Sequence, residues 1–94
     1  MRYIYLLEIK AKPGTVDELD AYVAGLLREA GSADGLDAID AYHDLDEPET
    51  IVVVEQWATV EAHDRYALGK DAKVDNLSQR LANPPVLRRL GPFR

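Results

Sequence analysis

Two side chains with acid–base chemistry, His63 and Tyr66, lie three positions apart in a stretch that is expected to be helical. Residues with this spacing share one side of a helix. An imidazole accepts and returns protons near neutral pH, and a phenol can orient a ring or donate a hydrogen bond to an oxyanion. We therefore interpret the pair as the candidate catalytic residues. The alternative is that His63 lies on the helix surface and that Tyr66 packs in the core.

Apolar and aromatic side chains elsewhere could wall a pocket for a planar substrate. Oxidation of a phenol or hydroquinone by molecular oxygen needs a dry aromatic pocket, a proton acceptor and a donor for the developing oxyanion. The candidate substrate-binding residues are Tyr5, Leu7, Tyr22 and Trp57. The alternative is that these residues pack in a core or, for Trp57, at a dimer interface.

The sequence contains no cysteine and two histidines, His43 and His63. Disulfides and thiolate metal sites are therefore excluded. His43 lies among Asp40, Asp44 and Asp46, but two histidines 20 residues apart are a weak pattern for a metal site. We expect no metal and no cofactor, and we treat His43 as an alternative proton carrier.

The 94 residues carry a formal net charge of −6, and 47% of them are hydrophobic. A chain of this length forms a single domain, and its acidity makes it a poor candidate for binding nucleic acid. It contains no apolar run of the ~20 residues that a membrane-spanning helix requires. Its N-terminus lacks the features of a secretory signal peptide. We expect one cytoplasmic domain over residues 1–94, with no membrane or nucleic-acid partner.

The charge is unevenly distributed along the chain. Residues 1–58 hold 4 basic and 13 acidic residues, a net charge of −9, whereas residues 59–94 hold 7 and 4, a net charge of +3. The simpler interpretation is that the acidic part packs beside the basic part. The alternative is that the basic part attracts an acidic ligand. The residues that could do so are Lys70, Lys73, Arg80, Arg88 and Arg89.

The pattern of apolar residues predicts four strands and three helices. The strands are expected at residues 2–11, 36–45, 50–57 and 86–90, and the helices at 16–30, 59–68 and 70–82. Thr15 and Glu18 have the spacing of a capping box, and Thr59 is a suitable N-cap. The resulting order, βαββα(α)β, is typical of the ferredoxin-like α+β fold, an antiparallel sheet with helices on one face.

Two of the expected strands are apolar on both faces. In the first strand, Ile4 and Leu6 point away from the face that carries Tyr5, and the run Ile51–Val54 places apolar side chains on both sides of the third strand. The helices can cover one face only. A second copy of the same sheet is the simplest cover for the other, so the pattern predicts a homodimer.

Glu55 lies inside the third strand, on the same face as Trp57. A carboxylate in such a position requires a partner. We expect Arg88 or Arg89 in the last strand to neutralise it.

The stretch Glu55–Tyr66 resembles the signature of the antibiotic biosynthesis monooxygenase (ABM) family. In that family an acidic residue, a spacer and a tryptophan end the third strand, and a capping Ser or Thr, an acidic-Ala pair and an aromatic residue or histidine follow. The turn at residues 12–14 and the Asn-Pro-Pro-Val sequence at 83–86 are also similar. The resemblance covers nearly the whole chain. It implies a dimeric α+β barrel in which two sheets face each other and each protomer has a pocket between its sheet and its helices.

The family includes haem-degrading oxygenases and cofactor-free oxygenases of polycyclic phenols and quinols. The haem-degrading branch uses an Asn, a Trp and a His at positions that here hold Leu7, Tyr66 and Asn76, so we expect no productive haem binding. The resemblance implies a cofactor-independent monooxygenase that acts on a phenolic, quinol-like or polyketide-like aromatic substrate. The alternatives are a non-catalytic dimeric binding or accessory protein, and an isomerase or cyclase.

Overall fold

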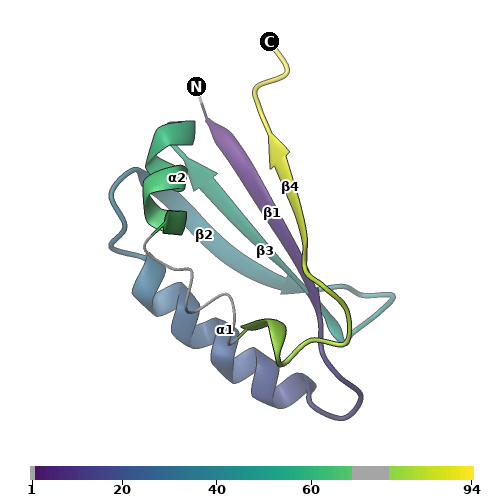
Figure 1. The fold of residues 1–94 in the computed structure, drawn as a ribbon. Coiled ribbons are helices and arrows are strands. Elements are labelled where there is room, and N and C mark those ends of the chain that lie inside the picture. The colour runs from purple at the N-terminus through teal and green to yellow at the C-terminus, as the bar shows by residue number, and fades with distance from the viewer. Residues whose placement is uncertain (1, 69–76) are drawn as a thin grey trace.

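The structure is a computed structural model of the chain, and it describes residues 2–68 and 77–94. The elements follow the order β1 (Tyr3–Lys10), α1 (Val16–Ala30), β2 (Leu36–His43), β3 (Thr50–Trp57), α2 (Val60–Leu68) and β4 (Val86–Leu90). The strands form one antiparallel sheet in the order β2-β3-β1-β4. Both helices lie on the same face of this sheet (Figure 1). The ferredoxin-like α+β fold predicted from the sequence is therefore confirmed.

The core between the sheet and the helices is divided into two clusters. The larger cluster includes Ile9 on β1 and Leu19 on α1, which are both almost fully buried. The smaller cluster consists of Tyr5, Trp57 and Ala62, and it joins β1 and β3 to α2. The first strand contributes to both clusters because alternate side chains of a strand share a face.

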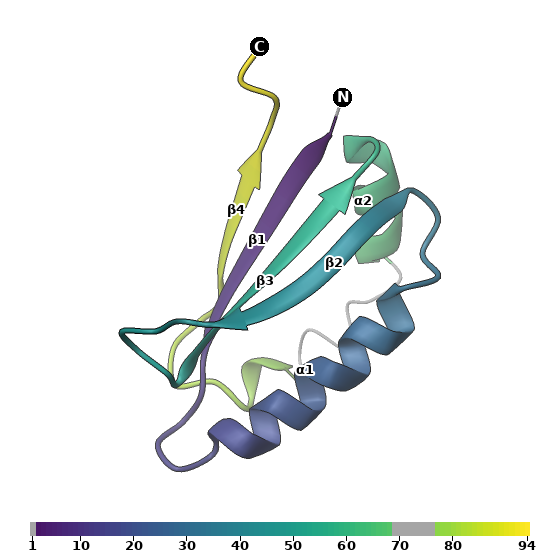
Figure 2. The ribbon, with the colours of Figure 1, turned by 180° about the vertical axis from the view of Figure 1, so that it is seen from behind.

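The face of the sheet opposite the helices is covered by neither α1 nor α2 (Figure 2). The strand alternation places Ile4, Leu6, Val52 and Val54 on this face, and all four are only partly buried. Tyr42 on β2 shares the face and is 56% exposed. We call this surface the open face. Its apolar character agrees with the sequence pattern from which a homodimer is predicted.

The two helix starts were expected to be capped by threonine side chains, and one of them is. The backbone N–H of Ala62 donates to Oγ1 of Thr59 over 3.1 Å, which confirms that N-cap. The prediction of a capping box at Thr15 is wrong. Its hydroxyl does not cap the helix, because Oγ1 of Thr15 donates to the carbonyl of Lys12 at 2.8 Å. The turn that contains Gly14, at a φ of +78°, brings that carbonyl within reach of the hydroxyl.

Two other boundaries differ from expectation or cannot be compared. The second strand was expected to extend to residue 45 but ends at His43, because a carboxylate oxygen of Asp44 accepts the backbone N–H groups of Asp46 and Glu47. Such a local bond favours a turn over continued strand pairing. The expected helix at 70–82 begins outside the described residues, with Lys70 and Lys73. Its end is wrong, because the helical residues 77–78 are followed by a turn and Leu81 forms an isolated bridge with Ala11.

Within residues 2–68 and 77–94, no helix is long and apolar enough to cross a membrane.

Candidate active site

Four aromatic side chains meet where α2 lies against β1 and β3. The imidazole of His63 stacks on the ring of Tyr5, with 3.6 Å between the ring centroids and 15° between the planes. Its other neighbour is Trp57, whose ring lies edge-on at 5.5 Å and 85°. The ring of Tyr66 lies 5.4 Å from that of Trp57. We call Tyr5, Trp57, His63 and Tyr66 the aromatic cluster.

The sheet and the loop before β2 together position this cluster. In the β1–β3 register Tyr3 is opposite Trp57 and Tyr5 is opposite Glu55, so these side chains share the helix-covered face. The backbone of Gly35 approaches α2 closely, since a Cβ built on Gly35 would lie 2.5 Å from Cβ of Ala62. The backbone N–H of Ala58 also donates to the carbonyl of Gly35 at 2.9 Å. The absence of a side chain at residue 35 thus lets α2 pack against this loop.

Gly35→Ala is expected to lower the free energy of unfolding by about 2–5 kcal/mol. The residue has a φ of +87°, a conformation that costs a non-glycine residue about 1–2 kcal/mol. The clash with Ala62 adds about 1–3 kcal/mol of overpacking. Urea unfolding followed by circular dichroism measures the change, and Gly25→Ala in α1 is the matched control because its new Cβ meets only the flexible end of Arg28. Equal unfolding midpoints for the two variants would contradict the expectation.

The indole of Trp57 is held by a hydrogen bond from its Nε1 to a carboxylate oxygen of Glu55, at 2.8 Å. The expectation that Arg88 or Arg89 neutralises Glu55 is wrong for the described residues, in which no ion pair of Glu55 occurs. The physical reason is proximity, since residues two apart on a strand share a face and the indole N–H lies within reach. Trp57 is fully buried, so this bond satisfies its only polar atom.

The imidazole of His63 lies beside the carboxylate of the next residue. Its Nδ1 lies 3.3 Å from a carboxylate oxygen of Asp64, and its side chain is 14% exposed. An ionised carboxylate can only accept a hydrogen bond, so the tautomer with its proton on Nδ1 is the one that can donate to Asp64, and in that tautomer Nε2 has the lone pair. A carboxylate at this position can orient the imidazole, and a neutral Nε2 can accept a proton.

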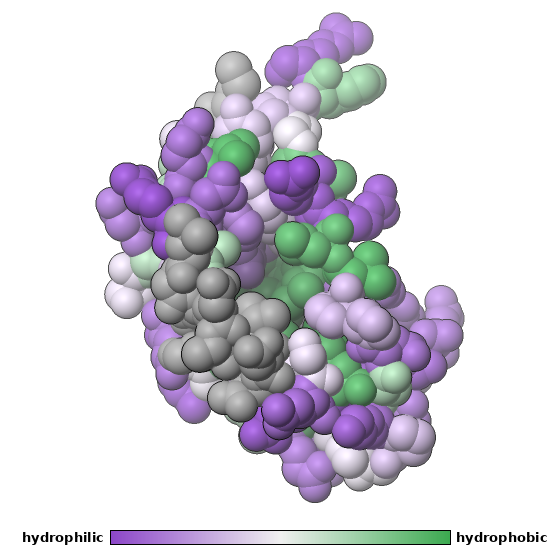
Figure 3. Space-filling view, viewed as in Figure 1, coloured by the Kyte–Doolittle hydropathy of each residue, from purple (hydrophilic) through white to green (hydrophobic). Residues whose placement is uncertain are grey.

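A hollow of about 290 Å³ adjoins the aromatic cluster. It is lined by Tyr3, Tyr5, Val60, Arg89, Leu90 and Gly91. Tyr5 carries the stacked imidazole of His63, and Val60 lies one helical turn before His63 on α2. The helix side of the molecule, shown in Figure 3, has apolar surface near its middle with hydrophilic residues around it. The hollow has the size of a small ligand site.

A model of the antibiotic biosynthesis monooxygenase family matches residues 2–73, which is more than half of the chain. The chain belongs to the antibiotic biosynthesis monooxygenase family. None of the curated proteins compared with this ABM domain matches it.

Solved structures with a similar fold come from several organisms. A conserved protein from Methanosarcina mazei Go1 is 20% identical, with 96% of this chain and 91% of that chain covered and a TM-score of 0.87. A structure described as an antibiotic biosynthesis monooxygenase is 16% identical over 100% of both chains, with a TM-score of 0.86. PA3566 from Pseudomonas aeruginosa is 17% identical, with 99% and 95% covered and a TM-score of 0.84. These likenesses agree with the fold of the ABM domain.

The pKa of the Tyr5 phenol in this ABM domain is raised, first by burial and then by the negative charge of Asp64. Glu55 and Glu61 act in the same direction, whereas the positive charge of Arg89 lowers the pKa. The hydroxyl of Tyr5 is therefore neutral at physiological pH and can donate a hydrogen bond.

Not every residue expected at the site lies in the aromatic cluster. Leu7 and Tyr22 pack against the larger core cluster instead, and the guanidinium of Arg80 lies 4.6 Å from the centroid of the Tyr22 ring. Asn76, at the position that would hold the histidine of the haem-degrading branch, lies outside the described residues. The ABM domain thus brings together Tyr5, Trp57, His63 and Tyr66.

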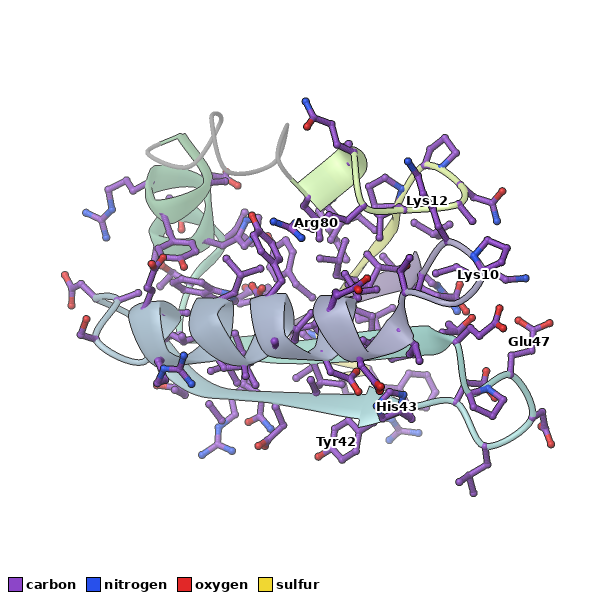
Figure 4. All side chains as sticks on the ribbon, turned by 90° about the horizontal axis from the view of Figure 1, so that it is seen from below. Lys10, Lys12, Tyr42, His43, Glu47 and Arg80 are labelled. Carbon is purple, nitrogen blue, oxygen red and sulfur yellow. The ribbon has the colours of Figure 1, made fainter. Side chains whose placement is uncertain are left out.

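His43 lies away from the aromatic cluster, at the end of β2 beside α1 (Figure 4). Its Nε2 is 3.0 Å from a carboxylate oxygen of Asp20, and its Nδ1 is 2.9 Å from the carbonyl oxygen of Pro48. These contacts give His43 a structural role in joining α1 to the β2–β3 hairpin. Among the described residues of the ABM domain, no group of three or more His, Asp or Glu side chains could hold a metal ion.

Sequence reasoning missed two features of the site. The stack of His63 on Tyr5 joins residues 58 positions apart. The second is the position of Arg89, which the sequence indicated only as one of five cations that could attract an acidic ligand. Arg89 lines the hollow because β4 pairs with β1 and places it opposite Tyr5. The available signal was the alternation of β4, which separates Arg88 from Arg89 onto opposite faces of the sheet.

Proposed function

We propose that this ABM domain is a cofactor-independent monooxygenase that acts on a phenolic, quinol-like or polyketide-like aromatic substrate. The observation that carries the proposal is the imidazole of His63, which lies 3.3 Å from Asp64 and stacks on Tyr5, a residue that lines the hollow. A proton acceptor next to aromatic walls is what this chemistry requires of a protein.

The proposed reaction begins with loss of the substrate hydroxyl proton to Nε2 of His63. The resulting anion is electron-rich and transfers electrons directly to molecular oxygen. For an anthrone, the hydroxyl is that of its enol form, and oxygen adds at the carbon that is CH₂ in the keto form. The peroxide takes the proton back from His63, and loss of water from the hydroperoxide leaves a carbonyl. One oxygen atom enters the product and the other leaves as water, so no external reductant is consumed.

The other cluster residues have supporting roles in this proposal. Tyr66 orients the substrate ring or donates a hydrogen bond to the developing oxyanion. Tyr5 forms a wall of the hollow, and its neutral hydroxyl is available as a donor. Trp57 is fully buried and holds the edge of the His63 ring. Leu7 and Tyr22 lie with the other core cluster and are not needed for the proposed step.

A second candidate function is a non-catalytic binding or accessory module of the same fold. It is favoured by the close packing of the cluster, in which Tyr5 is 2% and Trp57 is 0% exposed. In that case the stack on His63 stabilises the fold and the hollow binds a small aromatic molecule without changing it.

We also propose that the domain is a homodimer formed through the open face. Ile4 and Leu6 on β1 and Val52 and Val54 on β3 are partly buried apolar residues of this face, and Leu6 is directly opposite Val54. Covering such a surface with its own copy would produce the dimeric barrel that the resemblance implies.

Oxygen uptake distinguishes the two candidate functions. The protein, freed of metal with a chelator, is added to a panel of anthrones and hydroquinones, and the rate is compared with that of the heat-denatured protein. We expect one oxygen molecule to be consumed for each anthrone oxidised, with a rate that the chelator does not change. A panel that is oxidised no faster than in the denatured control would favour the binding module.

A further inference from the structure

We propose that Arg89 determines which aromatic ligand the hollow takes, by pairing with an anionic group at the end of the ligand opposite its hydroxyl. The ligand class is a hydroxyaryl carboxylate or a related acidic phenol. The inference rests on the proposed function, because the hydroxyl is placed towards His63.

The lining of the hollow carries a single charged side chain. Five of its residues are aromatic, aliphatic or glycine, and the sixth is Arg89. Arg89 is exposed, and within residues 2–68 and 77–94 it makes no ion pair. A guanidinium beside aromatic rings with no carboxylate of its own is suited to bind an anionic oxygen of a ligand through two parallel hydrogen bonds.

The register of the sheet fixes the position of this charge relative to the aromatic cluster. Arg89 on β4 is directly opposite Tyr5 on β1, and Glu55 on β3 is opposite Tyr5 on the other side. Side chains in such cross-strand pairs share a face and lie close together. Tyr5 thus lies between the positive charge of Arg89 on β4 and the side of the site that is formed by Glu55 and α2.

The charges on the two sides of Tyr5 have opposite signs. On the side of β3 and α2 lie Glu55, Glu61 and Asp64, and all three raise the pKa of Tyr5. On the side of β4 lies Arg89, which lowers it. A ligand anion is repelled from the first side and attracted to the second, whereas a neutral hydroxyl is not repelled from the side of His63. The field would therefore orient the ligand as well as attract it.

The net charge of the whole chain explains why an acidic ligand would need Arg89. A protein with a net charge of −6 repels anions at long range, so an acidic ligand requires a local cation. The sequence places a net positive charge of +3 in residues 59–94, and Arg89 brings one of these charges to the hollow.

The test is equilibrium binding under nitrogen, where no oxidation takes place. The probes are a hydroxynaphthoate with its hydroxyl and carboxylate at opposite ends of the ring system, and the methyl ester of the same compound. We expect the wild-type protein at pH 7 to bind the carboxylate roughly 10–100-fold more tightly than the ester, the range of a charge-assisted hydrogen bond. Added salt should reduce this preference.

Two variants assign the preference to a residue. Arg89→Gln is expected to bring the affinities for carboxylate and ester to about the same value, and Arg89→Lys to keep part of the difference because it keeps the charge. Arg28→Gln, on exposed α1, is the matched control, since it changes the net charge equally and should keep the full preference. Circular dichroism confirms that each variant is folded.

Three results would overturn the inference: equal affinity of the wild type for both probes, no binding of either probe, or the same loss of preference in Arg28→Gln. The oxygen-uptake assay is independent of this result. A selective binder that oxidises nothing would refute the proposed function and leave the ligand class standing, whereas an oxidase without selectivity would do the reverse.

Discussion

His63→Phe is expected to lower the rate of oxygen uptake by about 10²–10⁴-fold, the contribution of a positioned general base. Phenylalanine can keep the stack on Tyr5 and the edge contact with Trp57, but it has no nitrogen to accept the substrate proton. The loss of rate therefore reports proton transfer and not the collapse of the aromatic cluster. Tyr66→Phe, which removes a hydroxyl but keeps the ring, should have a smaller effect.

The other histidine is the natural control for this experiment. His43 is bonded to Asp20 and Pro48 and lies away from the aromatic cluster, so His43→Phe should leave the rate unchanged. Added imidazole is expected to restore part of the activity of His63→Ala, where a cavity replaces the ring. If the wild type and His63→Phe oxidise anthrone at equal rates, His63 is not the base.

Leu6→Asp is expected to weaken the proposed homodimer and favour the monomer. Leu6 lies on the central strand of the open face, between Val54 on β3 and Arg88 on β4. A dimer that covers this face would bury on the order of 2,000 Å² or more in total. Each of its two new carboxylates would lose water at a cost of at least about 1–3 kcal/mol. The dissociation constant of the dimer should therefore rise roughly 30-fold or more.

Analytical ultracentrifugation over a range of protein concentrations measures this change. Leu45→Asp is the matched control, because Leu45 is 94% exposed at the tip of the β2–β3 hairpin and should not affect the dimer. A wild-type protein that sediments as a monomer at micromolar concentration would refute the proposed dimer. Dissociation of the Leu45→Asp variant to the same extent would place the interface elsewhere.

The parts of the fold that the sequence predicted correctly are those with strong local signals. The strand at 50–57 was found with its observed limits because four consecutive aliphatic residues, Ile51–Val54, lie between a turn and Trp57. The cap at Thr59 was found because it depends on residues three positions apart. The capping box at Thr15 was wrong because a carbonyl three residues earlier competed for the same hydroxyl.

The candidate site was only partly predictable, because it depends on contacts between distant segments. The sequence indicated that His63 and Tyr66 could share a helix face, but it could not show that His63 stacks on Tyr5. It proposed Arg88 or Arg89 as the partner of Glu55, and the indole of Trp57 takes that place. Each outcome was decided by strand register and by short-range competition, which a single sequence does not encode in its periodicity.

The pairing of β1 with β4 has a consequence for how the domain acquires its hollow. Tyr5 and Arg89 lie near opposite ends of the sequence, and they become neighbours only when the edge strand β4 joins the sheet. Closing so long a loop is slow compared with forming a hairpin or a helix. A folding intermediate made of β1, β2, β3 and the helices would contain the aromatic cluster but no guanidinium beside it. The rate at which affinity for an acidic ligand returns during refolding would therefore measure the rate at which β4 pairs with β1.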